Sequence, residues 1–418
     1  MLHSCSSIVI HAAGDLRIEP QEVATPGAGE VLIQMQAGGI CGSDLHYYHN
    51  GGFGPIKLRE PMVLGHEVSG IIGALGTDTG DLQEGQLVAI SPSRPCHSCA
   101  FCTKGQHNHC LNMRFYGSAM PFPHIQGAFQ EHLVVSAAQC APADGLSAAQ
   151  AAMAEPLAVC LHAVAQAGDL TGKTVLITGC GPIGALCILA ARHAGAARVI
   201  ATDLSDYTLT MAQLCGADTP LNTAINPQAL EEFQADKGQV DVHLECSGAP
   251  AALAAGVACL RPRGILVQLG LGGDMTVPMQ ALTAKEITLR GSFRFHEEFF
   301  TAVKLMQSGA ITVDHLITHS FPVSEAVQAF TTASDRSQAM KVQLQFRPRR
   351  TWAKPGARLL RFHRNRRVAR YGQAAQCFVG AHILRRVGGL GVQGFCCMPG
   401  PTRVVEHAAR ESHHIGLP

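Results

Sequence analysis

The stretch TVLITGCGPIGALCILAARHAGAARVIATD, residues 174–203, joins an apolar strand-like run, a glycine-rich turn and an apolar helix-like run. Its glycines Gly179, Gly181 and Gly184 form Gly-x-Gly-x-x-Gly. In such a turn the first glycine permits the tight bend, the second lets the backbone approach a pyrophosphate, and the third lets the helix pack on the strand. Pro182 and Ile183 would open the helix, whose N-terminal N–H groups attract phosphate. The stretch therefore predicts a dinucleotide-binding unit.

Asp203 ends the next predicted strand, 19 residues after Gly184. A carboxylate at this place accepts hydrogen bonds from both ribose hydroxyls and repels a 2′-phosphate. Because no arginine follows within the next few positions, the sequence favours NAD as the cofactor, with NADP as the alternative. The competing interpretation is an ordinary strand–turn–helix unit in which Asp203 caps a helix.

Two kinds of pattern divide the chain. From residue 157 to about residue 290, strand-like and helix-like runs alternate, which predicts a parallel sheet with crossover helices. Residues 8–45 and the runs MVLGHEVSGIIGALG and GQLVAIS are instead typical of short antiparallel strands in a β-rich, barrel-like domain. We therefore predict an α/β protein with a β-rich domain over 1–156, a dinucleotide-binding domain over 157–290, and a return to the first domain over 291–346.

Four cysteines, Cys96, Cys99, Cys102 and Cys110, stand in the run PSRPCHSCAFCTKGQHNHC. Four thiolates held so closely fit a closed tetrahedral zinc site of structural type, so we predict a structural zinc lobe over residues 94–112. A pair of disulfides is disfavoured, because the N-terminal residues lack the basic start and the sustained apolar core of a secretory signal. A zinc ribbon that binds nucleic acid is a third interpretation.

The composition describes a chain with a sizeable core. It has 418 residues, 47% of them hydrophobic and 15% charged, which is enough for two or three domains. No apolar stretch approaches the roughly 20 residues that a membrane-spanning helix requires. We therefore expect a cytoplasmic protein without a membrane partner.

Residues 347–418 differ in kind from the rest. They carry 13 Arg and one Lys against two Glu, a net charge of +12, whereas residues 1–346 carry 18 basic and 29 acidic residues, a net charge of −11. One interpretation is a basic arm that binds nucleic acid or an anionic surface. We favour a disordered extension, translated past the natural end after a change of reading frame. The preceding segment has a natural last strand at Phe346, and a GC-rich stretch read out of frame is rich in Arg, Gly, Ala and Pro.

A second metal site is indicated by Cys41 in GGICGSDLHYY, His66 in GHE and Glu155 in AEPLAV. One thiolate, one imidazole and one carboxylate leave a fourth zinc position open for water or substrate, as a catalytic zinc needs. More than a hundred residues separate the first and the last of them, so spacing alone does not show that they meet.

Together, these motifs and the glycine-rich unit resemble the zinc-containing medium-chain alcohol and polyol dehydrogenases over residues 8–346. Within that family, residues 113–129 and 289–299 are most similar to the L-idonate 5-dehydrogenases, and next to the sorbitol (L-iditol) dehydrogenases. The resemblance implies a GroES-like catalytic domain made from both chain ends, an inserted Rossmann domain, and NAD(P)-linked oxidation of a secondary alcohol in a homodimer or homotetramer. The expected reaction is the reversible oxidation of L-idonate to 5-keto-D-gluconate, with one catalytic and one structural zinc ion.

The resemblance also implies roles for single residues around the catalytic metal. Cys41 and His66 match zinc ligands, and Glu67 or Glu155 completes the set, directly or through water. Ser43 and His46 match the residues that relay the proton of the substrate hydroxyl. In the competing interpretation Glu67 only orients His66, and His46 is a surface residue.

Substrate-contacting positions are matched by Tyr47, Arg294 and Phe295, the last in place of a tyrosine found in sorbitol dehydrogenases. Arg294, with Arg114 as a second candidate, is expected to bind the carboxylate of a sugar acid. The alternative, purely structural roles are core packing for Tyr47 and a solvated ion pair for Arg294. Two other functions stay open: a dehydrogenase of neutral polyols, which needs no such cation, and a metal- and nucleic-acid-binding protein that works through its basic tail.

Overall fold

The computed structural model describes residues 3–346, so the predictions made for the tail, residues 347–418, lie outside the described residues. Within that range no helix has both the length and the apolar character needed to cross a membrane.

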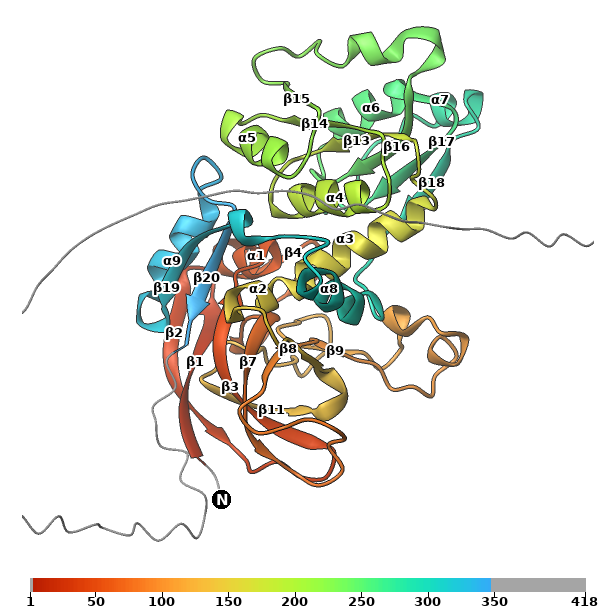
Figure 1. Cartoon of the computed structure of the whole chain (residues 1–418). Coiled ribbons are helices and arrows are strands. Elements are labelled where there is room, and N and C mark those ends of the chain that lie inside the picture. The colour runs from red at the N-terminus through yellow and green to blue at the C-terminus, as the bar shows by residue number, and fades with distance from the viewer. Residues whose placement is uncertain (1–2, 347–418) are drawn as a thin grey trace, which may run out of the picture. The chain divides into compact units, whose positions relative to one another are not determined.

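The dinucleotide-binding half is built on a six-stranded parallel sheet with the order β15-β14-β13-β16-β17-β18 (Figure 1). Counted from β13 along the chain, this is the order 3-2-1-4-5-6, which leaves a crevice at the carboxyl ends of β13 and β16. The strands are β13 (Thr174–Thr178), β14 (Arg198–Asp203), β15 (Thr219–Asn222), β16 (Val240–Glu245), β17 (Leu260–Gln268) and β18 (Thr288–Gly291). The helices of this half are α3 (Ala154–Ala167), α4 (Pro182–His193), α5 (Asp206–Leu214), α6 (Pro250–Cys259) and α7 (Met279–Ala284).

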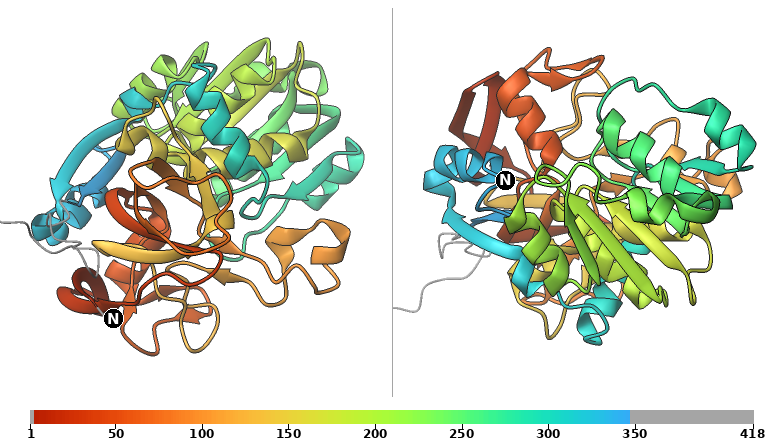
Figure 2. Two further views of the ribbon diagram at one scale, coloured as in Figure 1. Left: turned by 60° about the horizontal axis from the view of Figure 1, so that its bottom comes forward. Right: turned by 90° about the horizontal axis from the view of Figure 1, so that it is seen from above.

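Helices cover both faces of this sheet. Val175 and Ile177 of β13 belong to one hydrophobic core with residues of α3 and α4, whereas Leu176 belongs to another with residues of α6. Because successive side chains point to opposite faces, a strand buried on both sides reads as a continuous apolar run, and TVLIT does. The right view of Figure 2 shows these strands side by side.

The β-rich half contains a sheet in the order β12-β8-β7-β3-β20-β19, with β11 also paired to β3, and a smaller sheet in the order β2-β1-β6. Its longer strands are β1 (His3–Ala12), β2 (Asp15–Val23), β3 (Glu30–Gly39), β7 (Glu67–Leu75), β8 (Leu87–Ile90), β11 (His132–Ser136), β19 (Ile317–Pro322) and β20 (Lys341–Gln345). Short strands are β4 (Gly52–Phe53), β5 (Ile56–Lys57), β6 (Met62–Val63), β9 (Ser93–Arg94), β10 (Arg114–Phe115) and β12 (Cys140–Pro142). Its helices are α1 (Gly42–Asn50), α2 (Ala148–Ala152), α8 (Glu298–Gln307) and α9 (Ala326–Ser334).

The last strand of the described range returns to the first domain. β20 pairs antiparallel with β3, with Gln343 opposite Gly39, and β19 lies parallel to β20 on its other side. Residues from both ends of the described chain therefore form one sheet, as the family resemblance implied.

Two details differ from the sequence-based expectation. The strands expected over residues 8–45 end at Gly39, and α1 begins after Cys41 because the Asp44 carboxylate accepts the Cys41 N–H at 3.0 Å and satisfies a free donor of the helix start. The boundary proposed between residues 156 and 157 lies inside α3, which runs unbroken from Ala154 to Ala167.

Candidate functional site

The register between β3 and β7 brings the metal-ligand candidates together. Gly39, the last residue of β3, lies opposite Glu67, the first residue of β7. Cys41 comes two residues after Gly39 and His66 comes directly before Glu67, so the two side chains are close in space. The ligand atoms of Cys41, His66 and Glu67 lie within 4.8 Å of one another. A side chain at position 39 would collide with Glu67, since an added Cβ would lie 2.1 Å from its Oε2. Glycine in GGICG is therefore required for the carboxylate to reach this place.

Glu67 already has a partner that the sequence did not reveal. Lys341, at the start of β20, donates from Nζ to both carboxylate oxygens of Glu67 at 2.7 Å, and also to the carbonyl oxygen of Ile40 at 3.3 Å. The two side chains are only 3% and 1% exposed. Since both oxygens of Glu67 are occupied by the ammonium group, Glu155 is the freer of the two candidate carboxylates.

Asp44 is a second residue that sequence reasoning missed. It is fully buried, accepts from the backbone N–H of Cys41 and of Gly65, and has Oδ1 at 3.8 Å from Nδ1 of His66. Its position three residues after Cys41, in a capping box, was the available signal. A carboxylate beside the ring of a metal-binding histidine fixes the orientation of that ring.

The electrostatics of this group fit a divalent cation. Burial raises the pKa of the Cys41 thiol to about 12 and the pKa of the Glu155 carboxyl to about 8, and the charge of Glu67 acts in the same direction on both. His66 is buried with its Nδ1 atom without a hydrogen-bond partner. A thiolate, an imidazole and a carboxylate are ligands that zinc accepts, and a bound cation reverses the resistance of such groups to ionisation.

Besides Lys341, which bonds directly to Glu67, Arg294 is a second cation of this region. Its guanidinium lies 4.1 Å from the centroid of the Phe115 ring and donates to Sδ of Met120 at 3.4 Å. Burial lowers the pKa of Arg294 to about 10, while the charges of Glu155 and Tyr47 act in the opposite direction. The hydroxyl of Tyr47, a residue only 2% exposed, accepts the backbone N–H of Ala119 at 3.0 Å. Arg294 thus lies against the Phe115 ring, which also faces His66, and Tyr47 is buried on α1.

Two other predicted substrate residues lie elsewhere. Arg114 is exposed on β10, and the next residue, Phe115, is the one that faces His66, with ring centroids 5.8 Å apart. Neighbouring residues of a strand point to opposite faces, so Arg114 points away from this group. Phe295 is fully buried and packs against Phe115 and Phe299. It lines the core behind the site, with no surface left for a substrate.

Ser43 and His46 lie three residues apart on α1 and so share a helix face. Ser43 is half-buried, and its backbone N–H donates to the Cys41 sulfur. His46 is exposed, with its ring 5.7 Å from that of Phe53, and partial burial lowers its pKa. The two polar side chains thus lie on the face of α1 between Cys41 and solvent.

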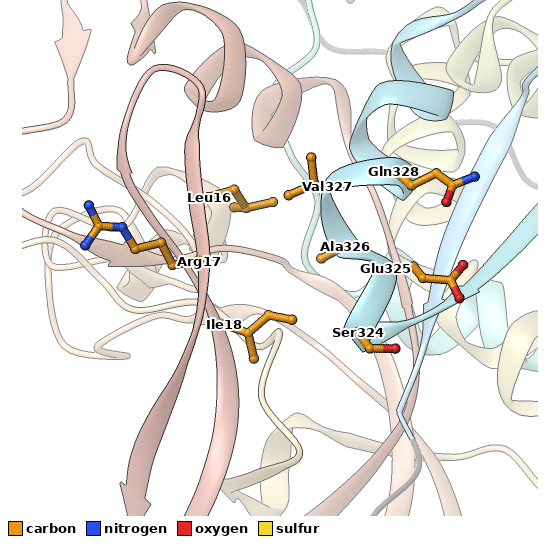
Figure 3. Close-up of a pocket in the computed structure, with 8 residues that line it drawn as sticks. All are labelled: Leu16, Arg17, Ile18, Ser324, Glu325, Ala326, Val327 and Gln328. Atoms are coloured by element: carbon orange, nitrogen blue, oxygen red, sulfur yellow. The ribbon is translucent and has the colours of Figure 1, made fainter.

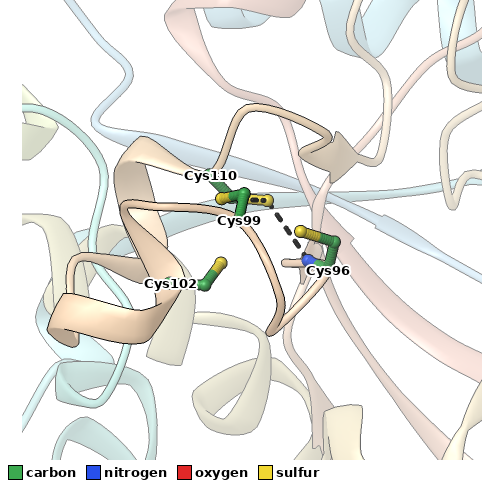
Figure 4. A group of neighbouring side chains, drawn as sticks. All are labelled: Cys96, Cys99, Cys102 and Cys110. Carbon is green, nitrogen blue, oxygen red and sulfur yellow. Dashed lines mark hydrogen bonds between the residues drawn. The ribbon is translucent and has the colours of Figure 1, made fainter.

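The four cysteines of the predicted lobe converge, as Figure 4 shows. All four are free thiols, and their sulfur atoms lie within 4.8 Å of one another. Backbone N–H groups of Cys96 and Asn112 donate to the Cys110 sulfur at 3.2 and 3.3 Å, and the Leu111 N–H donates to Cys99 at 3.5 Å. Amide donors favour the thiolate form, and hydrogen bonds from Ser98 lower the pKa of Cys96 to about 5. The set fits a closed tetrahedral zinc site.

The three glycines of the turn after β13 have the geometry that their predicted roles require. Gly179 has φ +82°, and an added Cβ at Gly184 would lie 1.8 Å from the carbonyl oxygen of Gly179. An added Cβ at Gly181 meets nothing within 4 Å, so the space in front of it is free for a ligand. Pro182 is the first residue of α4, and Ile183 follows it. This turn lies at the switch point of the sheet, where dinucleotides bind in such folds.

Asp203 lies at the end of β14, beside that turn. Its carboxylate accepts the backbone N–H groups of Cys180 at 2.6 Å and of Leu204 at 2.7 Å. The side chain is therefore held at the carboxyl edge of the sheet, where it can accept ribose hydroxyls.

A separate hollow of about 210 Å³ lies between residues 16–18 of β2 and residues 324–328 at the start of α9 (Figure 3). It contains none of the predicted site residues, and the chemistry described above lies elsewhere.

Two family models each match one part of this chain. Residues 27–145 match the family model described as the alcohol dehydrogenase GroES-like domain, and residues 182–308 match the model described as zinc-binding dehydrogenase. The chain is 44% identical over 319 residues to L-idonate 5-dehydrogenase (NAD(P)(+)) of Escherichia coli, which covers 75% of this chain and 91% of that protein. It is 36% identical over 349 residues to human sorbitol dehydrogenase, covering 82% of this chain and 96% of that protein.

The fold is also shared with a solved relative. The crystal structure of L-idonate 5-dehydrogenase from Escherichia coli superposes with a TM-score of 0.80 at 42% identity, covering 83% of this chain and 99% of that one. With a GroES-like half, a Rossmann-type half and both metal-ligand sets in place, the chain belongs to the zinc-binding alcohol dehydrogenase family.

Proposed function

We propose that this protein oxidises L-idonate at C5 to 5-keto-D-gluconate, reversibly, with NAD as the preferred hydride acceptor. The observation that carries the proposal is the position of Arg294, a half-buried guanidinium 4.1 Å from the centroid of the Phe115 ring, which itself faces the ring of His66 at 5.8 Å. A neutral polyol gives such a cation nothing to pair with, whereas the carboxylate of a sugar acid does. The similarity to an L-idonate 5-dehydrogenase at 44% identity supports the same substrate.

Each residue of the site has a proposed task. Cys41, His66 and Glu155 would hold zinc, which acidifies a coordinated hydroxyl, and NAD would accept the hydride. Arg294 binds the substrate carboxylate at one end and so orients the hydroxyl-bearing carbon at the other. Arg–carboxylate pairs are often bidentate, which fixes orientation as well as adding affinity. Lys341 neutralises Glu67 and leaves Glu155 as the carboxylate of the metal set.

Proton release follows the face of α1. Ser43 would accept the hydroxyl proton while passing its own proton on to His46, which releases it to solvent from its exposed position. Because partial burial lowers the pKa of His46, its ring is neutral at pH 7 and able to accept a proton. We further expect a cytoplasmic homodimer or homotetramer without a nucleic-acid partner.

The proposal is tested by NADH formation with L-idonate, sorbitol and L-iditol, each with NAD and with NADP, before and after zinc chelation. We expect chelator-sensitive activity that is highest with L-idonate and NAD. Sorbitol dehydrogenases are relatives at 36% identity, so activity on neutral polyols alone would move the assignment to that branch.

The variant Arg294→Gln sharpens the test. Charge-assisted hydrogen bonds of about 2–3 kcal/mol predict a loss of about 30–150-fold in kcat/KM for L-idonate and a much smaller loss for sorbitol. Arg114→Gln is the matched control, because Arg114 is exposed and points away from the site. Equal losses on both substrates in Arg294→Gln would refute carboxylate binding by Arg294.

A further inference from the structure

The zinc lobe lies against the segment that carries Arg294. Asn108 of the lobe donates from Nδ2 to the carbonyl oxygen of Phe293 at 3.0 Å, across 185 residues of sequence. The rings of His109 and Phe293 stack with centroids 6.1 Å apart, and those of His107 and His296 lie 4.2 Å apart. The lobe thus contacts the residues on both sides of Arg294. Figure 1 and the left view of Figure 2 show the lobe, in orange, projecting from the β-rich half.

Arg294 has a backbone conformation that needs such support. Its φ is +55°, in the left-handed region, where a residue with a side chain is about 1–2 kcal/mol less stable than in its usual conformations. Residues 293–295, in the segment between β18 and α8, make no backbone–backbone hydrogen bond that would impose this conformation. Contacts at its two flanks must do so: Phe295 is fully buried in the core, and Phe293 is held by Asn108.

The conformation decides where the guanidinium goes. Arg294 stacks on the ring of Phe115, which also lies beside the ring of His66 in the catalytic group. It also lies 4.9 Å from the ring of Phe293, the residue that the lobe holds. One short segment therefore contacts the lobe through Phe293 and the substrate site through Arg294.

We infer that the zinc lobe is a positioning element of the substrate site: through Asn108 it fixes the backbone at Phe293, and thereby aims Arg294 at the carboxylate of a sugar acid. This inference rests on the proposed function for the identity of the anion. Asn108 is a positioning residue, since it acts through Arg294 and does not itself reach the site. A lobe of purely structural importance would influence all substrates alike.

The test compares Asn108→Ala with a control in the same lobe. The control is Thr103→Ala, whose hydroxyl bonds to the Ala100 carbonyl oxygen inside the lobe. Loss of one hydrogen bond predicts a rise of about 5-fold in KM for L-idonate in Asn108→Ala, with unchanged kcat and zinc content, and no change of KM for sorbitol. Thr103→Ala should change neither. A parallel loss on both substrates would overturn the inference.

A double-mutant cycle isolates the route through Arg294. In the background of Arg294→Gln, Asn108→Ala should cause no further loss on L-idonate, because the group that it positions is gone. If the fold-losses of the two single variants multiply in the double variant, the inference is overturned. Asn108→Asp serves as a second variant, since it keeps the size of the side chain but sets a carboxylate against the Phe293 carbonyl oxygen, and the rise in KM should be at least as large as in Asn108→Ala.

Hydrogen exchange provides a readout that does not depend on activity. Residues 292–299 contain bonded amides, among them the Ser292 N–H to the Gln268 carbonyl oxygen and the His296 N–H to Glu298, each at 3.0 Å. Their exchange should accelerate in Asn108→Ala and not in Thr103→Ala, and unchanged exchange would refute the positioning role. Faster exchange in an enzyme that does not prefer L-idonate over sorbitol would support the positioning role and refute the substrate assignment.

Discussion

Replacing Lys341 by methionine should destabilise the β-rich half strongly while changing its shape little. The ammonium group is 3% exposed, its partner Glu67 is 1% exposed, and both carboxylate oxygens accept from it at 2.7 Å. Methionine has a similar length and no charge, so the variant leaves a buried carboxylate whose only cationic partner in the described residues is gone.

The size of the effect follows from this burial. Removing one partner of a buried ion pair costs about 3–5 kcal/mol, because the remaining charge is neither hydrated nor paired. The same substitution also removes the bond from Nζ to the Ile40 carbonyl oxygen. Replacing both partners by neutral groups costs far less, since no charge is then left in the low-dielectric interior.

Urea unfolding at a fixed zinc concentration measures both quantities. We expect Lys341→Met to lose about 3–5 kcal/mol of unfolding free energy, and Glu67→Gln/Lys341→Met to recover at least half of that loss. The matched control is Lys57→Met, because Lys57 is exposed on β5. A Lys341→Met variant as stable as the control, or a double variant no better than the single one, would refute the proposed electrostatic role of Lys341.

The remaining predictions concern three other regions. Gly181→Ala should leave the fold intact, because an added Cβ meets nothing, yet weaken NAD binding at least 10-fold in a fluorescence titration. Gly184→Ala should instead lower the unfolding temperature, because its Cβ would collide with the Gly179 carbonyl oxygen. Glu298 is half-buried, and although burial alone raises its pKa, hydrogen bonds from His162 and the backbone lower it to about 2. Its stabilisation, on the order of 3 kcal/mol, is therefore present above about pH 4.5 and lost as the pH falls towards 2, a slope that Glu298→Gln should remove from acid unfolding curves. Cys99→Ser should release the zinc ion of the four-cysteine site and leave the ion at Cys41 and His66 bound, so metal analysis should find one zinc ion per chain. Loss of both ions would contradict two independent sites.

Much of the fold could be predicted from short, contiguous stretches of the sequence. The assignments of fold class, enzyme class and family, and the expectation of zinc and NAD(P), are confirmed by the family models and by the relatives. The turn from Gly179 to Gly184 was readable because strand, glycines and helix are contiguous, so their chemistry is visible in one window. The four cysteines were readable for the same reason.

What the sequence hid depends on contacts between distant segments. Lys341 lies 274 residues from Glu67, and nothing in KVQLQ distinguishes a buried lysine from an exposed one. Arg114 and Phe115 are neighbours, and only the orientation of the two-residue strand β10 decides which of them faces His66. The roles proposed for Ser43, His46, Tyr47 and Arg294 remain predictions, to be checked by the experiments above.

The pairing of β3 with β20 has a consequence for biosynthesis. Residues 174–291 complete the parallel sheet while the chain is still being made, and β11 pairs early with residues 30–34 of β3, but residues 37–39 of β3 must wait for β20, some 300 residues later. Until then the nascent chain carries an unpaired end of a strand edge and, beside it, a carboxylate without its lysine. We therefore expect a chain ending at residue 335 to aggregate on release from the ribosome, in contrast to the full chain, as sedimentation of in vitro translated products would show. Early termination would thus remove the edge partner of β3 and the counter-ion of Glu67 in a single event.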